Sequence, residues 1–118
     1  RLPLQHAFEV KASDATVTKL VDIYPDGLRH VDTNNGFLPL HDALCFEASD
    51  EIVTKLVGIH PDGVKHVDGY GNLPLHWAVD KKASEAIVAK LVGIHPDGVK
   101  HANKSGQTPV TIAERKGR

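Results

Sequence analysis

The sequence has little cysteine and few aromatic residues. Cys45 is the one cysteine among 118 residues, so no internal disulfide can form, and we expect an intracellular protein of a reducing cytoplasm or organelle. One Trp, two Tyr and three Phe amount to only 5% of the chain, which is few for a conventional single core of this size. This scarcity suggests that the core is built in a different way.

The chain also lacks an excess of charge of one sign and any long apolar run. Its 14 Lys and Arg face 15 Asp and Glu, for a formal charge of −1, which argues against a general nucleic-acid or anionic-membrane binder. No apolar stretch approaches the roughly 20 residues of a membrane-spanning helix, so we expect no direct membrane insertion. The opening residues contain no apolar segment of the kind that a signal peptide needs. The remaining composition, with 41% hydrophobic residues, is ordinary for one soluble globular domain.

Most of the sequence consists of an internal repeat. Leu-Pro-Leu begins at residues 2, 38 and 73, and a related Thr-Pro-Val begins at 108, which gives spacings of 36, 35 and 35 residues. Residues 52–68 and 87–103 differ at only three positions. Such self-similarity is the signature of a repeat architecture. We therefore expect a single domain over 1–118, with repeats 2–37, 38–72 and 73–107 and a partial terminal repeat 108–118.

Each repeat is predicted to form a helix, a turn, a second helix and a loop. The proline after each opening Leu suits a first helical turn, and we expect this first helix to end near Ala12, Ala48 and Ala83. Ser13, Ser49 and Ser84 are expected N-caps of the second helices, each followed by an acidic residue.

The second helix of the middle repeat shows the expected packing pattern. Ile52, Val53, Leu56, Val57 and Ile59 form an apolar stripe at helical spacing. A Pro-Asp-Gly turn then ends this helix. A helix pair of this length cannot bury its stripe alone, so neighbouring repeats must supply the other wall. The fold class predicted is all-α, a helix-turn-helix solenoid with short hairpin loops and a thin aliphatic core.

These features together resemble the ankyrin repeat family. Its opening signature, Gly-x-Thr-Pro-Leu-His-x-Ala, is matched by Gly-Phe-Leu-Pro-Leu-His-Asp-Ala at 36–43 and Gly-Asn-Leu-Pro-Leu-His-Trp-Ala at 71–78. Looser matches begin the first repeat at 2–7 and the last at 106–113, and the second-helix pattern Glu-Ile-Val-x-x-Leu stands at 51–56. The period is longer than the family's 33 residues, and Leu replaces the signature Thr. We expect the fold to persist with a reshaped loop after the second helix.

Eight histidines invite a metal-site hypothesis, which the repeats weaken. Seven of them occupy repeated positions, and equivalent residues of stacked repeats should lie about 8–10 Å apart, too far to share zinc at about 2 Å per bond. We expect His41 and His76 to hydrogen-bond loop backbone, while a pair such as His60 and His66 stays open as a metal alternative. No cofactor is expected.

Catalysis is not expected either. Cys45 follows His41 on nearly the same helix face, but nothing else in the sequence supplies the oriented base, the oxyanion donor and the substrate cleft that a nucleophilic site needs. We therefore predict a non-enzyme.

The resemblance instead implies a scaffold that binds a protein partner through the concave face of its first helices and its hairpin tips, at positions that vary between repeats. Aromatic residues at such positions are typical interface anchors. The predicted partner-binding residues are His6, Glu9, Val10, Asn34, Asn35, Asp42, Cys45, Phe46, Tyr70, Trp77, Asp80 and Lys81.

A second hypothesis is a structural subunit, or a fragment of a longer array, buried in a larger assembly. Solenoids need terminal repeats with a polar outer face, whereas this sequence opens on Leu-Pro-Leu and closes after one helix of its last repeat. This hypothesis predicts end-to-end contacts with neighbouring chains.

Overall fold

The computed structural model describes residues 3–117, and every regular element in that range is helical, with no strand. Three helix pairs follow one another: α1 (Pro3–Glu9) with α2 (Asp14–Ile23), α3 (Pro39–Cys45) with α4 (Asp50–Ile59), and α5 (Pro74–Asp80) with α6 (Glu85–Ile94). A last helix, α7 (Pro109–Lys116), follows them. The all-α prediction is confirmed. Leu2, the first residue of the predicted first repeat, lies outside the described residues.

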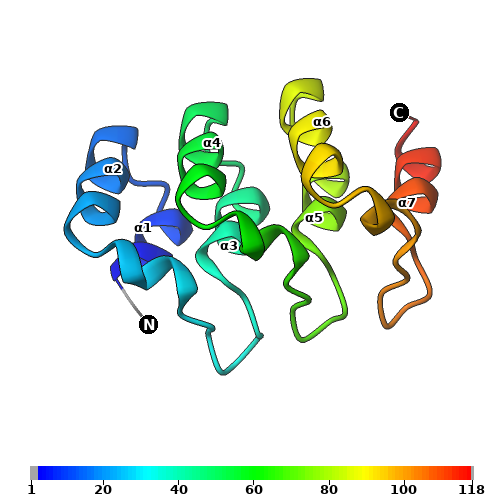
Figure 1. Ribbon diagram of the computed structural model, residues 1–118, viewed down its shortest axis with the longest axis horizontal. Helices are drawn as coiled ribbons and strands as arrows, with labels where there is room; N and C mark the ends of the chain where they lie inside the picture. Colours follow the sequence, from blue (N-terminus) through cyan, green and yellow to red (C-terminus); the bar gives the residue numbers. More distant parts are fainter. Residues whose placement is uncertain (1–2, 118) are drawn as a thin grey trace.

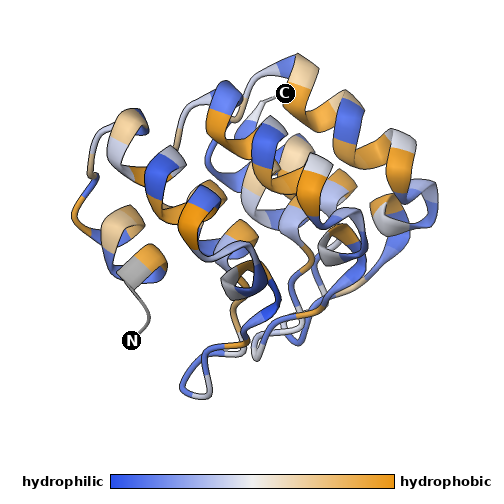
Figure 2. Cartoon of the chain, turned by 60° about the vertical axis from the view of Figure 1, so that its left-hand side comes forward, coloured by the Kyte–Doolittle hydropathy of each residue, from blue (hydrophilic) through white to orange (hydrophobic). Residues whose placement is uncertain are grey.

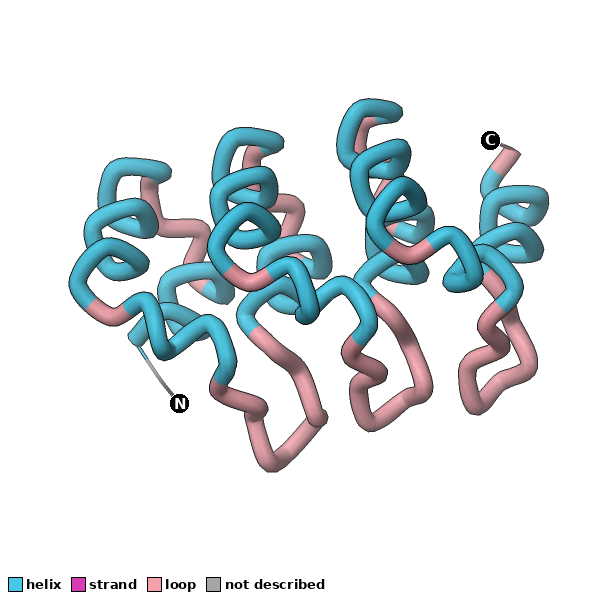
Figure 3. Tube along the Cα trace, viewed as in Figure 1, coloured by secondary structure: helices cyan, strands magenta, loops and turns pink. Residues whose placement is uncertain are grey.

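The helix pairs lie side by side along the 38 Å long axis of the molecule (Figure 1). The first helices α1, α3, α5 and α7 contact one another in series, and so do the second helices α2, α4 and α6. The loops that join successive pairs project from one edge (Figure 3). Hydrophilic residues predominate along these loops, whereas apolar residues are concentrated in the helices (Figure 2).

The serine N-caps are confirmed at all three second helices. The side chains of Ser13, Ser49 and Ser84 accept hydrogen bonds from the backbone N–H three residues later, at 3.2–3.3 Å. Two of these serines also join neighbouring repeats, because Ser49 Oγ donates to Asp14 Oδ2 at 2.7 Å and Ser84 Oγ to Asp50 Oδ2 at 2.6 Å. Ser49 and Ser84 therefore each start a second helix and tie it to the second helix of the preceding repeat.

The first helices end earlier than predicted. They stop at Glu9, Cys45 and Asp80, because Lys11, Glu47 and Lys82 adopt positive φ angles of 56°, 60° and 57°. Each of these left-handed residues ends the first helix of its repeat. After Glu47, for example, the Ala48 N–H donates back to Ala43 O at 2.8 Å. The sequence offers none of the glycines that usually signal such an ending.

The Pro-Asp-Gly turns are short 3₁₀ helices: η1 (Pro25–Arg29), η2 (Pro61–Lys65) and η3 (Pro96–Lys100). Each of these turns directly follows a second helix, where the sequence predicts a turn.

The core between the two helix layers is mainly aliphatic, although Phe8 belongs to it and is only 3% exposed. Ala43 and Ala78 are fully buried, and Val21, Leu56 and Leu91 are at most 2% exposed. Ile59, predicted to complete the apolar stripe, is 37% exposed. That prediction is wrong for Ile59 because it is the last residue of α4, where the chain turns into η2 and leaves the packed layer.

Candidate interaction surface

The loop edge is fixed to the helices by buried histidines. His41 accepts the Leu38 N–H at Nδ1 (3.1 Å), so its proton lies on Nε2, which faces the His66 carbonyl at 3.0 Å. His76 repeats this arrangement with the Leu73 N–H at 2.9 Å and the His101 carbonyl at 2.9 Å. The predicted hydrogen bonds to loop backbone are confirmed.

Burial keeps the imidazoles of His41 and His76 uncharged at neutral pH. It lowers the pKa of His41 to about 4, an effect that the nearby Asp68 carboxylate partly opposes. Burial likewise lowers the pKa of His76, while its hydrogen bonds to backbone carbonyls act in the other direction. A neutral imidazole is the form that can accept at Nδ1 and donate at Nε2 at the same time.

Successive loops are also joined to one another. The Gly69 N–H donates to Asn35 O at 2.8 Å, and the Lys104 N–H donates to Tyr70 O at 3.1 Å. The approach is so close that a Cβ on Gly36, where φ is +74°, would lie 2.6 Å from the Gly69 nitrogen. The loop tips therefore form one continuous, backbone-linked edge.

Asp68 fixes the tip of the loop between η2 and α5. Its Oδ1 accepts the N–H groups of Tyr70 and Asn72, both at 2.9 Å, and its Oδ2 accepts Trp77 Nε1–H at 2.8 Å. Because Asp68 is only 5% exposed, these bonds are shielded from water and are stronger than exposed ones. One carboxylate thus fixes both the loop tip and the indole of α5.

Three aromatic rings meet at this point and form a group that we call the aromatic cluster: Phe37, Tyr70 and Trp77. The Phe37 ring lies edge-on to Trp77 at a centroid distance of 5.4 Å and to Tyr70 at 6.3 Å, an arrangement that aromatic pairs prefer. Phe37 is buried, Trp77 is half-buried and Tyr70 is 57% exposed. The cluster therefore has a buried base and an accessible aromatic top.

The other predicted partner-binding residues fall into three groups. His6, Glu9, Val10 and Asn34 are exposed, and Asn35, Cys45, Phe46, Asp80 and Lys81 are partly exposed. Asp42, in contrast, is 1% exposed. The expectation of an accessible side chain at Asp42 is wrong because α3 is packed between α1 and α5.

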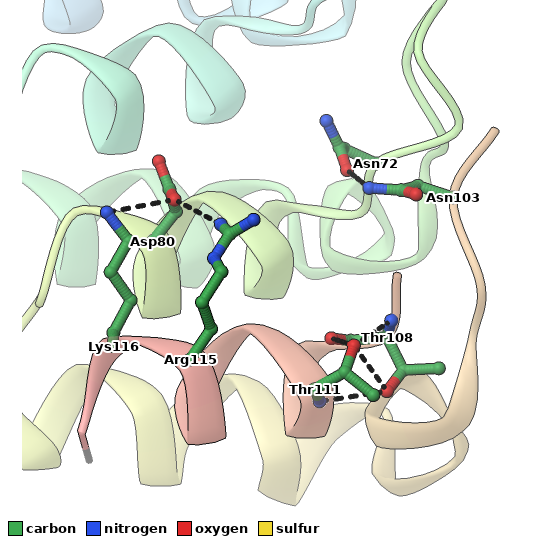
Figure 4. Close-up of polar contacts among 7 residues, drawn as sticks. All are labelled: Asn72, Asp80, Asn103, Thr108, Thr111, Arg115 and Lys116. Carbon is green, nitrogen blue, oxygen red and sulfur yellow. Dashed lines mark hydrogen bonds and ion pairs between the residues drawn. The ribbon is translucent and has the colours of Figure 1, made fainter. Parts of the chain in front are cut away.

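Asp80 is already engaged within the chain. Its carboxylate lies 3.5 Å from Arg115 Nη2 and 3.4 Å from Lys116 Nζ (Figure 4). The sequence prediction missed both cations because they come from α7, 35 and 36 residues further along the chain. It also missed Phe37, although the residues at the equivalent positions of the next repeats are Asn72 and Gln107. An aromatic residue at a position that varies between repeats was the signal by which the sequence could have indicated Phe37 as part of the site.

Cys45 is half-buried, and burial raises the pKa of its thiol, although the nearby Lys81 ammonium opposes the rise. The thiol is therefore protonated at neutral pH, which is the unreactive form. Within 3–117, no group of three or more His, Cys, Asp or Glu residues is placed to hold a metal ion. None of the helices described in the same range has the length and apolar character to cross a membrane.

No family model matches the chain, and no curated protein is significantly similar to it. Its functional interpretation therefore rests on the internal repeat and on the contacts described above.

Proposed function

We propose that the chain is an ankyrin-type solenoid. Three observations support this: the Leu-Pro-Leu segments at 38–40 and 73–75 open α3 and α5, His41 and His76 make the same backbone bonds one repeat apart, and like helices contact like helices along the row. An intracellular location is consistent with its single cysteine.

We further propose that it is a non-catalytic scaffold that binds a protein partner. The observation that carries this proposal is the aromatic cluster, which combines a fixed indole with a ring that is 57% exposed. Trp and Tyr are enriched among the few residues that carry most of the binding energy at protein interfaces. Because Asp68 already holds the Trp77 indole, little side-chain freedom is lost on binding, which favours affinity.

The test is an affinity capture from cell extract followed by mass spectrometry, with wild-type protein and the Tyr70→Ala variant side by side. Tyr24→Ala is the matched control, because Tyr24 is an equally exposed tyrosine (64%) outside the predicted surface. Proteins that bind wild type and Tyr24→Ala but not Tyr70→Ala support the proposal. Captured proteins that are equally retained by all three chains contradict it.

The alternative is a structural subunit, or part of a longer array, held within a larger assembly. An apolar groove of about 370 Å³ favours it, lined by residues that include Leu4, Leu20, Ile23 and Tyr24. Ile23 and Tyr24 are 53% and 64% exposed and line the same groove, and exposed apolar residues that lie together mark contact sites more than scattered ones do. Loss of captured proteins on Tyr24→Ala, with Tyr70→Ala unaffected, would favour this alternative.

A further inference from the structure

The last first helix, α7, leaves an apolar side chain uncovered that the earlier first helices bury. α1, α3 and α5 each pack against the second helix of their own repeat, whereas within residues 3–117 no second helix follows α7 (Figure 1). Val110 of α7 is 48% exposed. The leucines at its position in the three earlier helices are at most 6% exposed: Leu4, Leu40 and Leu75.

The side of α6 that faces away from α4 shows the same loss of cover. Val88 and Val92 are only partly buried there. The valines at these two positions of α2 and α4 are at most 2% exposed: Val17, Val21, Val53 and Val57. The sequence of α6 thus keeps the apolar pair that a neighbouring second helix buries in the two preceding repeats.

The two complete interfaces between second helices show what kind of helix covers such a pair. Val17 of α2 and Ile52 of α4 line one hollow between these helices. Val53 of α4 and Ile87 of α6 line the equivalent hollow in the next interface. The covering helix in each interface buries an isoleucine and, four residues later, a leucine, all at most 3% exposed: Ile52 with Leu56, and Ile87 with Leu91.

A polar contact accompanies this packing in both interfaces. The N-cap serine of the covering helix donates to the first acidic residue of the preceding second helix, from Ser49 to Asp14 and from Ser84 to Asp50. Glu85 stands at this acidic position in α6 and is exposed. Its carboxylate is therefore placed to accept from the N-cap hydroxyl of a further helix.

We infer that α6 and α7 together dock one amphipathic helix of a partner protein. The docking surface, which we call the end step, consists of Glu85, Val88, Val92 and Val110. The partner helix lies beside α6 as α6 lies beside α4, with a serine or threonine N-cap and with aliphatic side chains four residues apart. Recognition of an amphipathic helix by an apolar surface is a recurrent mode of peptide binding. The end step shares no residue with the aromatic cluster, so this inference goes beyond the proposed function.

A second copy of the chain does not provide this helix in the same register. The second helix at the start of a copy is α2, and α1 packs against it. With α2 placed beside α6, the α1 of that copy would occupy the position of α7. A helix without such an attached first helix has no such clash, which favours a partner helix.

The probe is a fluorescent peptide with the sequence of residues 83–95, which carries the serine cap, the isoleucine and the leucine of α6. The control peptide carries Ile87→Asp and Leu91→Asp. Fluorescence anisotropy with the full chain gives Kd for each peptide. We expect saturable binding of the first peptide, at least tenfold tighter than that of the control. Equal affinities, or no saturable binding below about 1 mM, overturn the inference.

Variants of the chain locate the binding site. Val88→Thr/Val110→Thr should weaken peptide binding about tenfold, and Val110→Thr alone, at an exposed site that the fold does not need, about threefold. The matched control is Val31→Thr/Val67→Thr, at valines that are 36% and 39% exposed in the loops after η1 and η2. It should leave Kd within about twofold. Unchanged binding by Val110→Thr, or equal weakening by both double variants, contradicts the end step.

A double-mutant cycle tests the polar contact. Glu85→Gln in the chain should weaken binding of the serine peptide about threefold and leave binding of a peptide with Ser84→Ala unchanged. The cycle separates the contact from any loss of helix in the alanine peptide, because that loss affects both chains equally. Equal effects of Glu85→Gln on the two peptides contradict the proposed register.

Sedimentation of the chain alone identifies a competing occupant. A dimer that Val88→Thr/Val110→Thr converts to a monomer, together with no peptide binding, would mean that a second copy covers the end step, and would overturn the partner helix. Tyr70→Ala should bind the peptide as wild type does. Failure of the end step and failure of the aromatic surface are therefore distinguishable.

Discussion

The buried imidazole of His41 makes the stability of the chain depend on pH. Its pKa is about 4 in the folded chain, against about 6.5 when unfolded. Between these values the unfolded state binds more protons, so the free energy of unfolding falls as pH is lowered from 6.5 to 4. From these two pKa values, His41 alone should cost about 2 kcal/mol between pH 7 and pH 5.

The His41→Gln variant isolates this contribution. Gln5 stands at the equivalent position of the first repeat, where its Nε2 donates to the Phe37 carbonyl at 3.4 Å, so a glutamine fits this place and does not titrate. Urea unfolding of both chains at pH 7 and pH 5 gives four free energies. The loss on acidification should be about 2 kcal/mol smaller in the variant.

The other titrating groups cancel in this comparison. His76 and His60, whose pKa values are also lowered by burial, add to the acid sensitivity of both chains equally. An identical loss of stability in wild type and His41→Gln would refute the claim that His41 is held neutral by burial.

Three further predictions concern packing and fixed polar contacts. Leu56→Ala should lower the free energy of unfolding by about 3 kcal/mol in urea titrations, because Leu56 is 2% exposed. The equivalent Leu20→Ala should cost clearly less, since Leu20 is only partly buried, and equal costs would contradict the packing. Ser49→Ala should cost about 1–2 kcal/mol by removing an N-cap and the bond to the preceding repeat; a thermal melt that matches wild type would contradict this role. Asp68→Asn should cost about 1–3 kcal/mol and shift the fluorescence of the single tryptophan, because the amide cannot accept both the backbone and indole N–H groups; an unchanged spectrum would show that the indole bond is absent.

Local rules account for what the sequence predicted well. Helix starts, serine caps and the bonds that His41 and His76 accept at Nδ1 depend on residues within a few positions of one another, and the repeat shows each pattern more than once. The Nε2 bonds to the carbonyls of His66 and His101 span 25 residues, and the repeat period brings these groups together. The helical class and the aliphatic core follow from the same spacing.

The incorrect expectations depend on longer-range packing or on rare backbone conformations. Asp42 is buried because its helix has neighbours on both sides, which the variability of that position does not reveal. Asp80 is paired through α7, a contact across a whole repeat. The early helix ends require residues such as Glu47 to adopt a left-handed backbone conformation. A sequence without glycine at that position does not indicate this conformation.

Trp77 shows the same limit at the candidate site. The sequence indicated that it lies in a variable, accessible position, but not that Asp68 fixes its indole or that Phe37 supports its ring. Substituting Trp77 would therefore disturb stability as well as binding, which makes Tyr70 the cleaner probe of the surface.

The most direct test of the proposed scaffold function is a calorimetric titration of a purified captured partner against wild type, Tyr70→Ala and Tyr24→Ala. The account predicts binding about 30-fold weaker for Tyr70→Ala, equivalent to about 2 kcal/mol, with Tyr24→Ala close to wild type and all three chains equally stable. Undiminished affinity of Tyr70→Ala would contradict the claim that the aromatic cluster is where the partner binds.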